Sequence, residues 1–350
     1  MFENRETSSI AEMGEFGLIA HLTRAVEIKN DSTTKGIGDD AAVLDFSDRK
    51  TLISTDLLLE GIHFDLRYVP LKHLGYKAVQ VNLSDIYAMN GTASQITFSI
   101  GLSSKFPLEA VEEIYAGVLM ACKKYNIDLV GGDTSSSVQG LVISVTSIGY
   151  AHKEKVVYRN GAETGDLICV SGDLGGAYVG LQLLEREKQI FLENPKIQPD
   201  LEGKDYIIER QLKPEARKDI VDLLNELDIK PTSMIDVSDG LASEILHICK
   251  ESNKGCRIYE EKIPIDPMTY DTAREFGLDP TVCALSGGED YELLFTVKQE
   301  EYDKLKNSME ISIIGHITDV SDGCDLISKS GVAHPITAQG WNSLKPKSNQ

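Results

Sequence analysis

The sequence lacks long apolar runs and an excess of basic residues. No apolar stretch approaches the roughly 20 residues that a membrane-crossing helix needs, and the N-terminal MFENRETSSI lacks the charged-then-apolar order of a signal peptide. The 35 Lys and Arg are outnumbered by 55 Asp and Glu, so the formal net charge is −20. Nucleic acids and anionic membranes would be repelled by this charge. We therefore expect a cytoplasmic protein that binds neither.

Paired-cysteine motifs are also missing. None of the cysteines shows a CxxC spacing, and most lie within apolar runs, where a thiol behaves as a small hydrophobe. This pattern is typical of a protein in a reducing compartment and excludes a disulfide scaffold. The six cysteines are Cys122, Cys169, Cys249, Cys256, Cys283 and Cys324.

What the chain does have is an ordinary globular composition, with 41% apolar and 26% charged residues in 350. β-like runs such as 51–59 alternate with helical periods such as 71–89, which predicts a mixed α/β fold of the α+β type. The pattern restarts after His152, so we predict two domains, 1–152 and 153–350. The polar segment 189–204 is expected to be an excursion, and SDRK before residue 51 suits a hairpin turn.

Six short motifs join small residues to a carboxylate. Hard cations such as Mg²⁺ prefer oxygen ligands, and glycines let the backbone approach a phosphate closely. Any one of these motifs is also typical of an ordinary capped turn. Clustered aspartates would repel one another without a cation, but spacing alone does not establish that they cluster. The motifs are GIGDD (Asp39, Asp40), STD (Ser54–Asp56), NLSD (Asn82, Asp85), VGGD (Gly131–Asp133), DVSD (Asp236, Ser238, Asp239) and SGGED (Ser286–Asp290).

The common phosphate-binding signatures are absent. The chain has no GxxxxGK[ST] loop and no HRD, DFG and VAIK set, which argues against P-loop enzymes and protein kinases. SGDLGGA at 171–177 follows a predicted strand but lacks the GxGxxG order of a dinucleotide fold. A packing role for this turn is at least as well supported as ligand contact.

Taken together and in order, the motifs resemble the thiamine-monophosphate kinase family, within the aminoimidazole ribonucleotide synthetase superfamily. The resemblance covers roughly residues 12 to 345. It is carried by GEFGLI, GIGDDAAVL, STDLLLEGIHF, KAVQVNLSDIYAMNG, LVGGDT, VYRNGAETGD, QLKPEAR, IDVSDGL and ALSGGEDYELLFT.

The resemblance implies ATP-dependent phosphorylation of thiamine monophosphate to thiamine diphosphate, with several Mg²⁺ ions. It places ATP and Mg²⁺ binding and dimerisation in domain 1–152, and a second α/β domain that completes the substrate site in 153–350. The implied metal ligands are Asp40, Ser54, Thr55, Asp56, Asp85, Asp133, Asp236 and Asp239. The implied nucleotide contacts are Gly132, Asp133, Arg159, Ser238 and Tyr115, and the implied substrate contacts are His63, Glu289 and Trp341.

These carried-over roles have ordinary alternatives. A histidine between Ile62 and Phe64 is usually packed or on the surface, and a lone tryptophan is usually core. Asp39 and Asp290 are expected to support their neighbours. No catalytic base is predicted, because the acceptor phosphate is already ionised and in-line transfer depends on positioning and charge screening.

Two rival functions remain open. A selenophosphate or aminoimidazole ribonucleotide synthetase would share the superfamily, but the former usually places a reactive Cys and a Lys near its N-terminus, and the first cysteine here is Cys122. A noncatalytic divalent-cation module would bind metal without nucleotide, although the EF-hand signature is missing.

Overall fold

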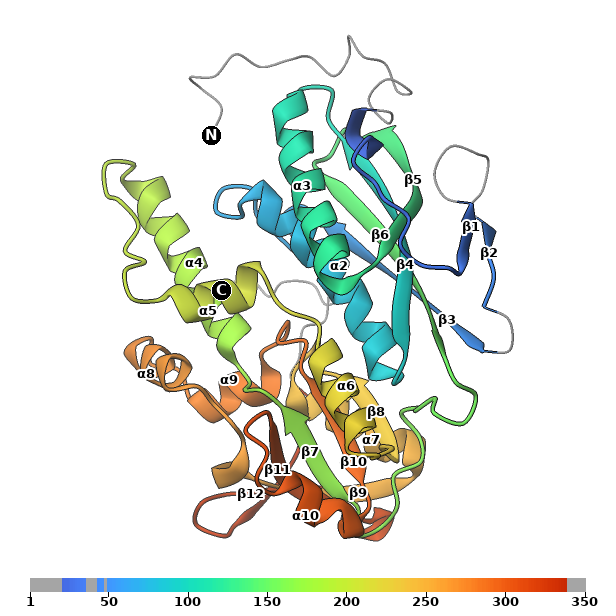
Figure 1. The fold of residues 1–350 in the computed structure, drawn as a ribbon. Coiled ribbons are helices and arrows are strands. Elements are labelled where there is room, and N and C mark those ends of the chain that lie inside the picture. Colours follow the sequence, from blue (N-terminus) through green and yellow to red (C-terminus); the bar gives the residue numbers. More distant parts are fainter. Residues whose placement is uncertain (1–20, 36–42, 47–48, 339–350) are drawn as a thin grey trace. The chain divides into compact units, whose positions relative to one another are not determined.

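The computed structural model describes residues 21–35, 43–46 and 49–338. The chain divides into two compact units, 1–156 and 157–350 (Figure 1), and each is described here by itself.

Unit 1 contains a four-stranded mixed sheet in the order β3-β6-β4-β5. β6 pairs antiparallel with both β3 and β4, and β4 pairs parallel with β5. A separate antiparallel ladder joins β1 and β2. The elements are β1 (Thr33–Lys35), β2 (Val43–Leu44), β3 (Lys50–Leu59), α2 (Leu71–Ala88), β4 (Thr92–Leu102), α3 (Leu108–Tyr125), β5 (Asp128–Ser136) and β6 (Val142–Ala151).

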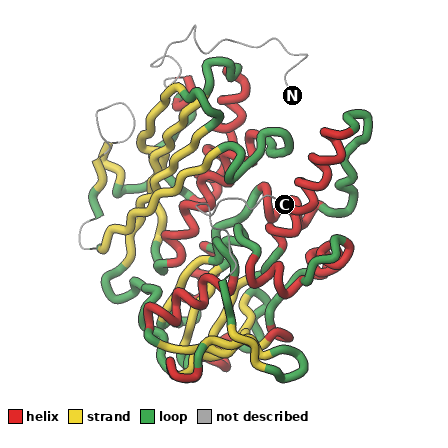
Figure 2. The backbone as a smooth tube through the Cα atoms, turned by 180° about the vertical axis from the view of Figure 1, so that it is seen from behind, coloured by secondary structure: helices red, strands yellow, loops and turns green. Residues whose placement is uncertain are grey.

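Helices α2 and α3 lie together on one face of this sheet (Figure 1), and the view from behind shows the strands of the other face (Figure 2). Gly75 and Gly117 make close packing of the two helices possible: a Cβ on Gly117 would lie 1.9 Å from the Lys72 carbonyl oxygen. α3 begins after Pro107 and is capped at its C-terminus by Asn126, whose φ of 56° is left-handed. Alternate residues of β6, such as Ile143 and Val145, are fully buried beneath the helices.

The structure confirms the helix expected at 71–89 and corrects two expectations. β2 pairs with β1 and β3 pairs with β6, so the hairpin expected around SDRK is wrong. The expected excursion at 189–204 begins too early, because helix α4 continues to Glu193. In that final turn, the Asn194 backbone N–H donates to the Ile190 carbonyl oxygen at 2.9 Å, so helical hydrogen bonding continues although Phe191 and Leu192 are exposed.

Unit 2 contains a seven-stranded sheet in the order β13-β12-β9-β11-β7-β10-β8. All its strand pairs are antiparallel except β12 with β9. The strands are β7 (Leu167–Ser171), β8 (Ser233–Asp236), β9 (Lys254–Tyr259), β10 (Leu293–Val297), β11 (Ile311–Asp319), β12 (Cys324–Ile327) and β13 (Ala333–Pro335). The helices are α4 (Gly176–Glu193), α5 (Asp205–Leu212), α6 (Lys218–Glu226), α7 (Leu241–Ser252), α8 (Pro267–Glu275), α9 (Pro280–Ser286) and α10 (Tyr302–Leu305), with 3₁₀ turns η1 (Glu260–Lys262), η2 (Gln299–Glu301) and η3 (Val320–Asp322).

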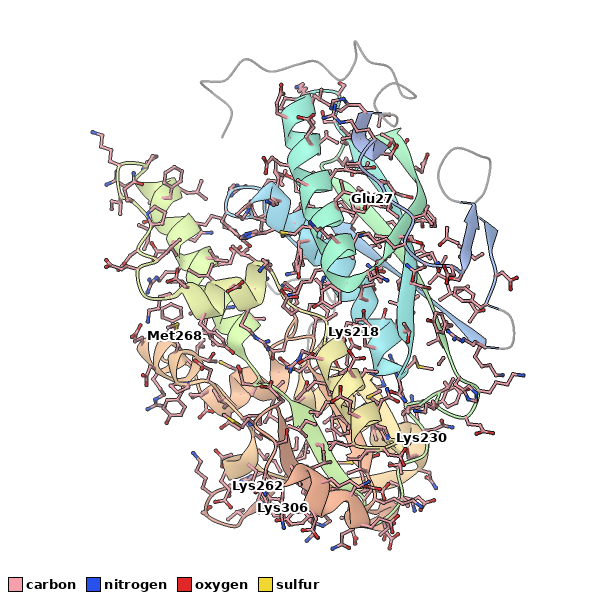
Figure 3. The ribbon with its side chains drawn as sticks, in the orientation of Figure 1. Glu27, Lys218, Lys230, Lys262, Met268 and Lys306 are labelled. Atoms are coloured by element: carbon pink, nitrogen blue, oxygen red, sulfur yellow. The ribbon has the colours of Figure 1, made fainter. Side chains whose placement is uncertain are left out.

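Two apolar clusters hold unit 2 together. The larger one packs α7 residues such as Ile245 against strand residues such as Ile258 and Ile317. The smaller one joins α4, α5, α8 and α9, and the partly buried Met268 near the start of α8 packs against it (Figure 3). Asp266 caps α8 by accepting a hydrogen bond from the Met268 backbone N–H at 2.7 Å.

Candidate active site

The STD motif lies in the middle of β3, against α2. Because side chains alternate along a strand, Ser54 and Asp56 lie on the same side of the sheet. Ser54 Oγ donates a hydrogen bond to Asp85 Oδ2 at 2.5 Å, and the backbone N–H of Asp56 donates to Asn82 Oδ1 at 2.9 Å. Asn82 and Asp85 share one face of α2, since they are three residues apart. The structure therefore brings STD and NLSD into direct contact.

The two carboxylates of this group repel each other. Burial, together with the smaller effect of the negative charge on Asp85, raises the pKa of Asp56 from 3.8 to about 6. A bound cation would relieve both effects, and carboxylate and hydroxyl oxygens are the ligands that Mg²⁺ prefers. The donor set of Ser54, Asp56 and Asp85 therefore fits a hard divalent cation.

Thr55 and Asp133 occupy different positions in the sheet. Thr55 lies on the face opposite Ser54, where its Oγ1 donates to the Val145 carbonyl oxygen at 2.9 Å. Asp133 is exposed on β5, which is separated from β3 by β6 and β4. Within unit 1, the structure does not place Asp133 beside the Ser54–Asp85 group.

Gly132 and Tyr115 have clear packing roles. A Cβ on Gly132 would lie 1.9 Å from the Phe98 carbonyl oxygen, so glycine is required there by the parallel neighbour β4. The Tyr115 ring packs edge-on against Phe98 at 5.3 Å, and burial raises the pKa of its phenol to about 12. These contacts describe a core residue, and its predicted nucleotide contact stays a prediction.

His63 lies in the turn that follows β3. Its Nδ1 accepts a hydrogen bond from the Leu59 backbone N–H at 3.0 Å, and its own backbone N–H donates to the Leu59 carbonyl oxygen at 2.9 Å. The half-buried ring is therefore fixed at the end of the strand that carries Asp56.

In unit 2, the DVSD motif connects the end of β8 to α7. Asp236 is buried at the end of β8, and Ser238 and Asp239 form the turn that follows. Glu244, in the first turn of α7, accepts hydrogen bonds from the backbone N–H groups of Ser238 (3.2 Å) and Asp239 (2.7 Å). Sequence reasoning missed Glu244, although an acidic residue in the first turn of the predicted helix was an available signal.

The SGGED loop lies directly beside DVSD. The Glu289 backbone N–H donates to the Ser238 carbonyl oxygen at 2.7 Å, and the Tyr291 backbone N–H donates to the Val237 carbonyl oxygen at 2.9 Å. Glu289 and Tyr291 have φ values of 69° and 52°, a left-handed conformation that costs energy for residues with a side chain. Gln211 Nε2 also donates to Glu289 Oε2 at 2.7 Å. The structure thus joins two motifs that are 50 residues apart in the sequence.

Asp290 points away from this turn into the glycine-rich segment 171–177. It accepts hydrogen bonds from the backbone N–H groups of Gly175 (2.7 Å) and Ala177 (3.2 Å). Burial raises the pKa of Asp290 to about 7, although Arg210 and the two N–H groups act in the opposite direction. These contacts fit the supporting role expected for this residue.

A buried charge network behind the SGGED loop was not predicted. Glu292, which is 1% exposed, forms ion pairs with Arg210 at 2.8 Å and with Arg217. Ser171 Oγ also donates to Glu292 at 2.5 Å. No local sequence pattern marks these partners, because Ser171 comes from β7, Arg210 from α5 and Arg217 from the position that precedes α6.

The remaining predicted residues have fewer described contacts. Arg159 is exposed at the start of unit 2, where its carbonyl oxygen accepts from Ser252 Oγ at 3.4 Å. Asp39, Asp40 and Trp341 lie outside the described residues.

Comparison with known proteins decides the family. The family models described as AIR synthase related protein match residues 38–151 with the N-terminal domain and 163–323 with the C-terminal domain. A thiamine-monophosphate kinase from Aquifex aeolicus is 35% identical over 302 residues, covering 86% of this chain and 92% of the relative. The chain belongs to the thiamine-monophosphate kinase family. The resemblance seen in the motifs is confirmed.

Solved structures of this family share the fold. The crystal structure of the thiamine-monophosphate kinase from Stenotrophomonas maltophilia K279a matches with a TM-score of 0.77 and 30% identity, over 92% of this chain and 98% of that one. A structure of AaThiL complexed with AMPPCP and TMP matches with a TM-score of 0.73 and 32% identity, over 97% of this chain and 99% of that one. The predicted mixed α/β fold is confirmed. Among the residues described, no helix combines the length and apolar character needed to span a membrane.

Proposed function

We propose that this protein uses ATP to phosphorylate thiamine monophosphate, giving thiamine diphosphate. Family membership supports the reaction, since related structures include AaThiL in complex with AMPPCP and TMP. Within the chain, the observation that carries the proposal is the pairing of Asp56 and Asp85 beside Ser54. A carboxylate whose pKa is raised by burial and by a neighbouring carboxylate, as for Asp56, suits a site for the cations that accompany polyphosphates.

Mg²⁺ is the cofactor that fits the side chains of Ser54, Asp56 and Asp85. When bound, it would screen the charge on the phosphates and so let two polyanions approach each other. The residues we propose to hold Mg²⁺ are Ser54, Thr55, Asp56, Asp85 and Asp133 in unit 1, Asp236 and Asp239 in unit 2, and Asp40 outside the described residues.

The protein itself would mainly bind and orient the two phosphate groups. We assign no general base, because the attacking phosphate oxygen is ionised at neutral pH. The fixed DVSD and SGGED turns support this role, since their backbones are joined by hydrogen bonds and Glu244 caps one of them. Proposed contacts are Gly132, Asp133, Arg159, Ser238 and Tyr115 for the nucleotide, and His63, Glu289 and Trp341 for thiamine monophosphate.

We also propose that unit 1 forms a homodimer through the sheet face that none of the described helices of unit 1 covers (Figure 2). Ile53 and Leu57 on β3 are 69% and 51% exposed, and they alternate with the residues that face α2. Exposed apolar side chains on a regular sheet face are typical of an interface.

A cytoplasmic location is proposed as well, supported by the thiol state of all six cysteines and by the use of ATP.

A substrate screen tests the proposed reaction. Purified protein with ATP and Mg²⁺ should form thiamine diphosphate and ADP only when thiamine monophosphate is present. Removal of Mg²⁺ with EDTA should stop product formation, and excess Mg²⁺ should restore it. ATP consumption that depends instead on selenide or on a formylglycinamidine ribotide would overturn the proposal in favour of a synthetase.

A further inference from the structure

Three thiols meet in unit 2, away from the residues discussed so far. Cys249 comes from α7, Cys256 from β9 and Cys324 from β12, and their Sγ atoms all lie within 4.8 Å of one another. In the described part of the chain, this is the one group of three or more His, Cys, Asp or Glu side chains with ligand atoms this close. Three convergent thiols need an explanation beyond apolar packing.

The backbone holds the three cysteines in place. Asn253, with φ 53°, ends α7 and turns the chain directly into β9, which brings Cys249 and Cys256 together. Cys324 is the direct register partner of Cys256 in the parallel β9–β12 pair. The Cys256 backbone N–H also donates to the Gly323 carbonyl oxygen at 3.0 Å. The site is therefore built from a tight helix-to-strand turn and a pair of hydrogen-bonded strands.

Close packing next to the thiols makes this arrangement rigid. A Cβ on Gly255 would lie 2.3 Å from the Gly323 carbonyl oxygen and 2.7 Å from that of Asp319. Glycine at position 255 therefore lets β9 approach the turn that precedes β12. A preorganised ligand set loses less conformational entropy when it binds.

The sulfur separations fit a metal ion. Zinc–sulfur bonds are about 2.3 Å long, so thiolates around one ion lie about 3.8–4.0 Å apart in trigonal or tetrahedral geometry. This distance falls within the 4.8 Å limit that encloses the group. A disulfide would satisfy only two of the three sulfurs, and it needs a separation of about 2.05 Å.

The surroundings favour a soft cation. Cys249 and Cys256 are 2% and 0% exposed within the larger apolar cluster, whereas Cys324 is half-buried and offers access from solvent. Within the described residues, no carboxylate or imidazole belongs to the group. Three thiolates leave a net charge of −1 with Zn²⁺ and −2 with Cu⁺, so the divalent ion leaves less uncompensated charge in an apolar setting.

We propose that Cys249, Cys256 and Cys324 form a binding site for one soft divalent metal ion, Zn²⁺ in the first instance, with an open fourth position on the Cys324 side. Such an ion would fasten β12 to β9 and to the end of α7. The DVSD turn lies at the opposite end of α7, about 12 Å along the helix axis from Cys249. The site is thus a structural one, distinct from the proposed kinase chemistry.

Metal titration of the reduced full-length protein tests the proposal. Cd²⁺ should produce an ultraviolet thiolate-to-metal charge-transfer band that saturates at one ion per chain, and Zn²⁺ should abolish the band by competition. Zn²⁺ should also raise the melting temperature, since it binds the folded form. Mg²⁺ should produce neither the band nor competition with Cd²⁺, because it prefers oxygen ligands.

Variants and thiol mapping separate this site from other metal binding. Cys256→Ser should lose the band, whereas Cys122→Ser and Cys169→Ser, which also alter buried thiols, should keep it. If Cys256→Ser fails to fold, alkylation of the wild-type protein followed by peptide mass spectrometry replaces it: Zn²⁺ should slow the modification of Cys324 relative to the metal-free protein. Absence of the charge-transfer band, an unchanged band in Cys256→Ser, or unchanged alkylation of Cys324 would overturn the proposal.

Discussion

The backbone N–H of Asp56 donates a hydrogen bond to the side-chain oxygen of Asn82 at 2.9 Å, and this contact fixes β3 against α2. The residue pair joins the STD motif of β3 to the NLSD motif of α2. Its effect is to hold the Asp56 carboxylate near that of Asp85, at a cost in electrostatic repulsion. Binding sites commonly keep such unfavourable arrangements because the ligand relieves them.

Asp56→Asn should therefore separate activity from stability. We expect the rate of thiamine diphosphate formation to fall by at least about 100-fold, because a proposed metal ligand is lost. In metal-free protein at neutral pH, the free energy of unfolding should rise by about 1 kcal/mol, because the cost of burying the charged carboxylate and its repulsion with Asp85 are both removed. Kinase assays and urea denaturation with EDTA measure the two effects. Asp271→Asn, an exposed change on α8, should alter neither.

Glu244 should act as a positioning residue for the DVSD turn. Glu244→Ala removes the acceptor for the Ser238 and Asp239 backbone N–H groups, so we expect a loss of about 1–2 kcal/mol in stability. The value of kcat/KM should fall about 10-fold or more, since the turn is no longer fixed. Glu244→Gln keeps one acceptor oxygen and should retain much of the stability and of the kcat/KM that Glu244→Ala loses. Equal activity in Glu244→Ala and wild type would show that the cap has no functional role.

Asp290 should make stability depend on pH. Its folded pKa is raised from 3.8 to about 7, so the folded state binds more protons than the unfolded state between about pH 4 and 7. The stability of the wild type should accordingly fall as pH rises through this window, by about 2–4 kcal/mol from this group. Asn at position 290 cannot titrate, so the Asp290→Asn variant should lose less stability between pH 4.5 and 7.5, by that amount. Urea denaturation across the range tests this, and parallel curves would contradict it.

Gly117 should be essential for the packing of α3 on α2. Alanine would gain about 1 kcal/mol in helix propensity, but its Cβ would lie 1.9 Å from the Lys72 carbonyl oxygen, and backbone cannot move aside cheaply. The steric clash should outweigh the gain in helix propensity, with a net loss of about 2 kcal/mol in unfolding free energy. Gly101→Ala in β4, whose nearest atom would be 3.5 Å away, is the control without crowding and should cost less. Thermal unfolding of both variants distinguishes the two sites.

Several features of this protein follow from its sequence alone. The β-like run at 51–59 predicted β3, and the helical spacing of apolar residues predicted α2, because burial on one side of a helix imposes a period on the chain. The order of the aspartate motifs identified the family, which the comparisons confirm. Such signals are local, or they depend only on order along the chain.

Tertiary structure decided which of these residues meet. The partner of Glu292 could not be predicted, because Arg210 and Arg217 reach it from other elements. The β3 partner was predicted wrongly for the same reason, since a turn signal does not specify long-range pairing. The cysteines show the difference most clearly: without a CxxC spacing they suggested simple apolar packing, yet a helix end and two paired strands bring Cys249, Cys256 and Cys324 together. Separation along the chain does not fix separation in space, because strand pairing and helix packing set the distances between side chains.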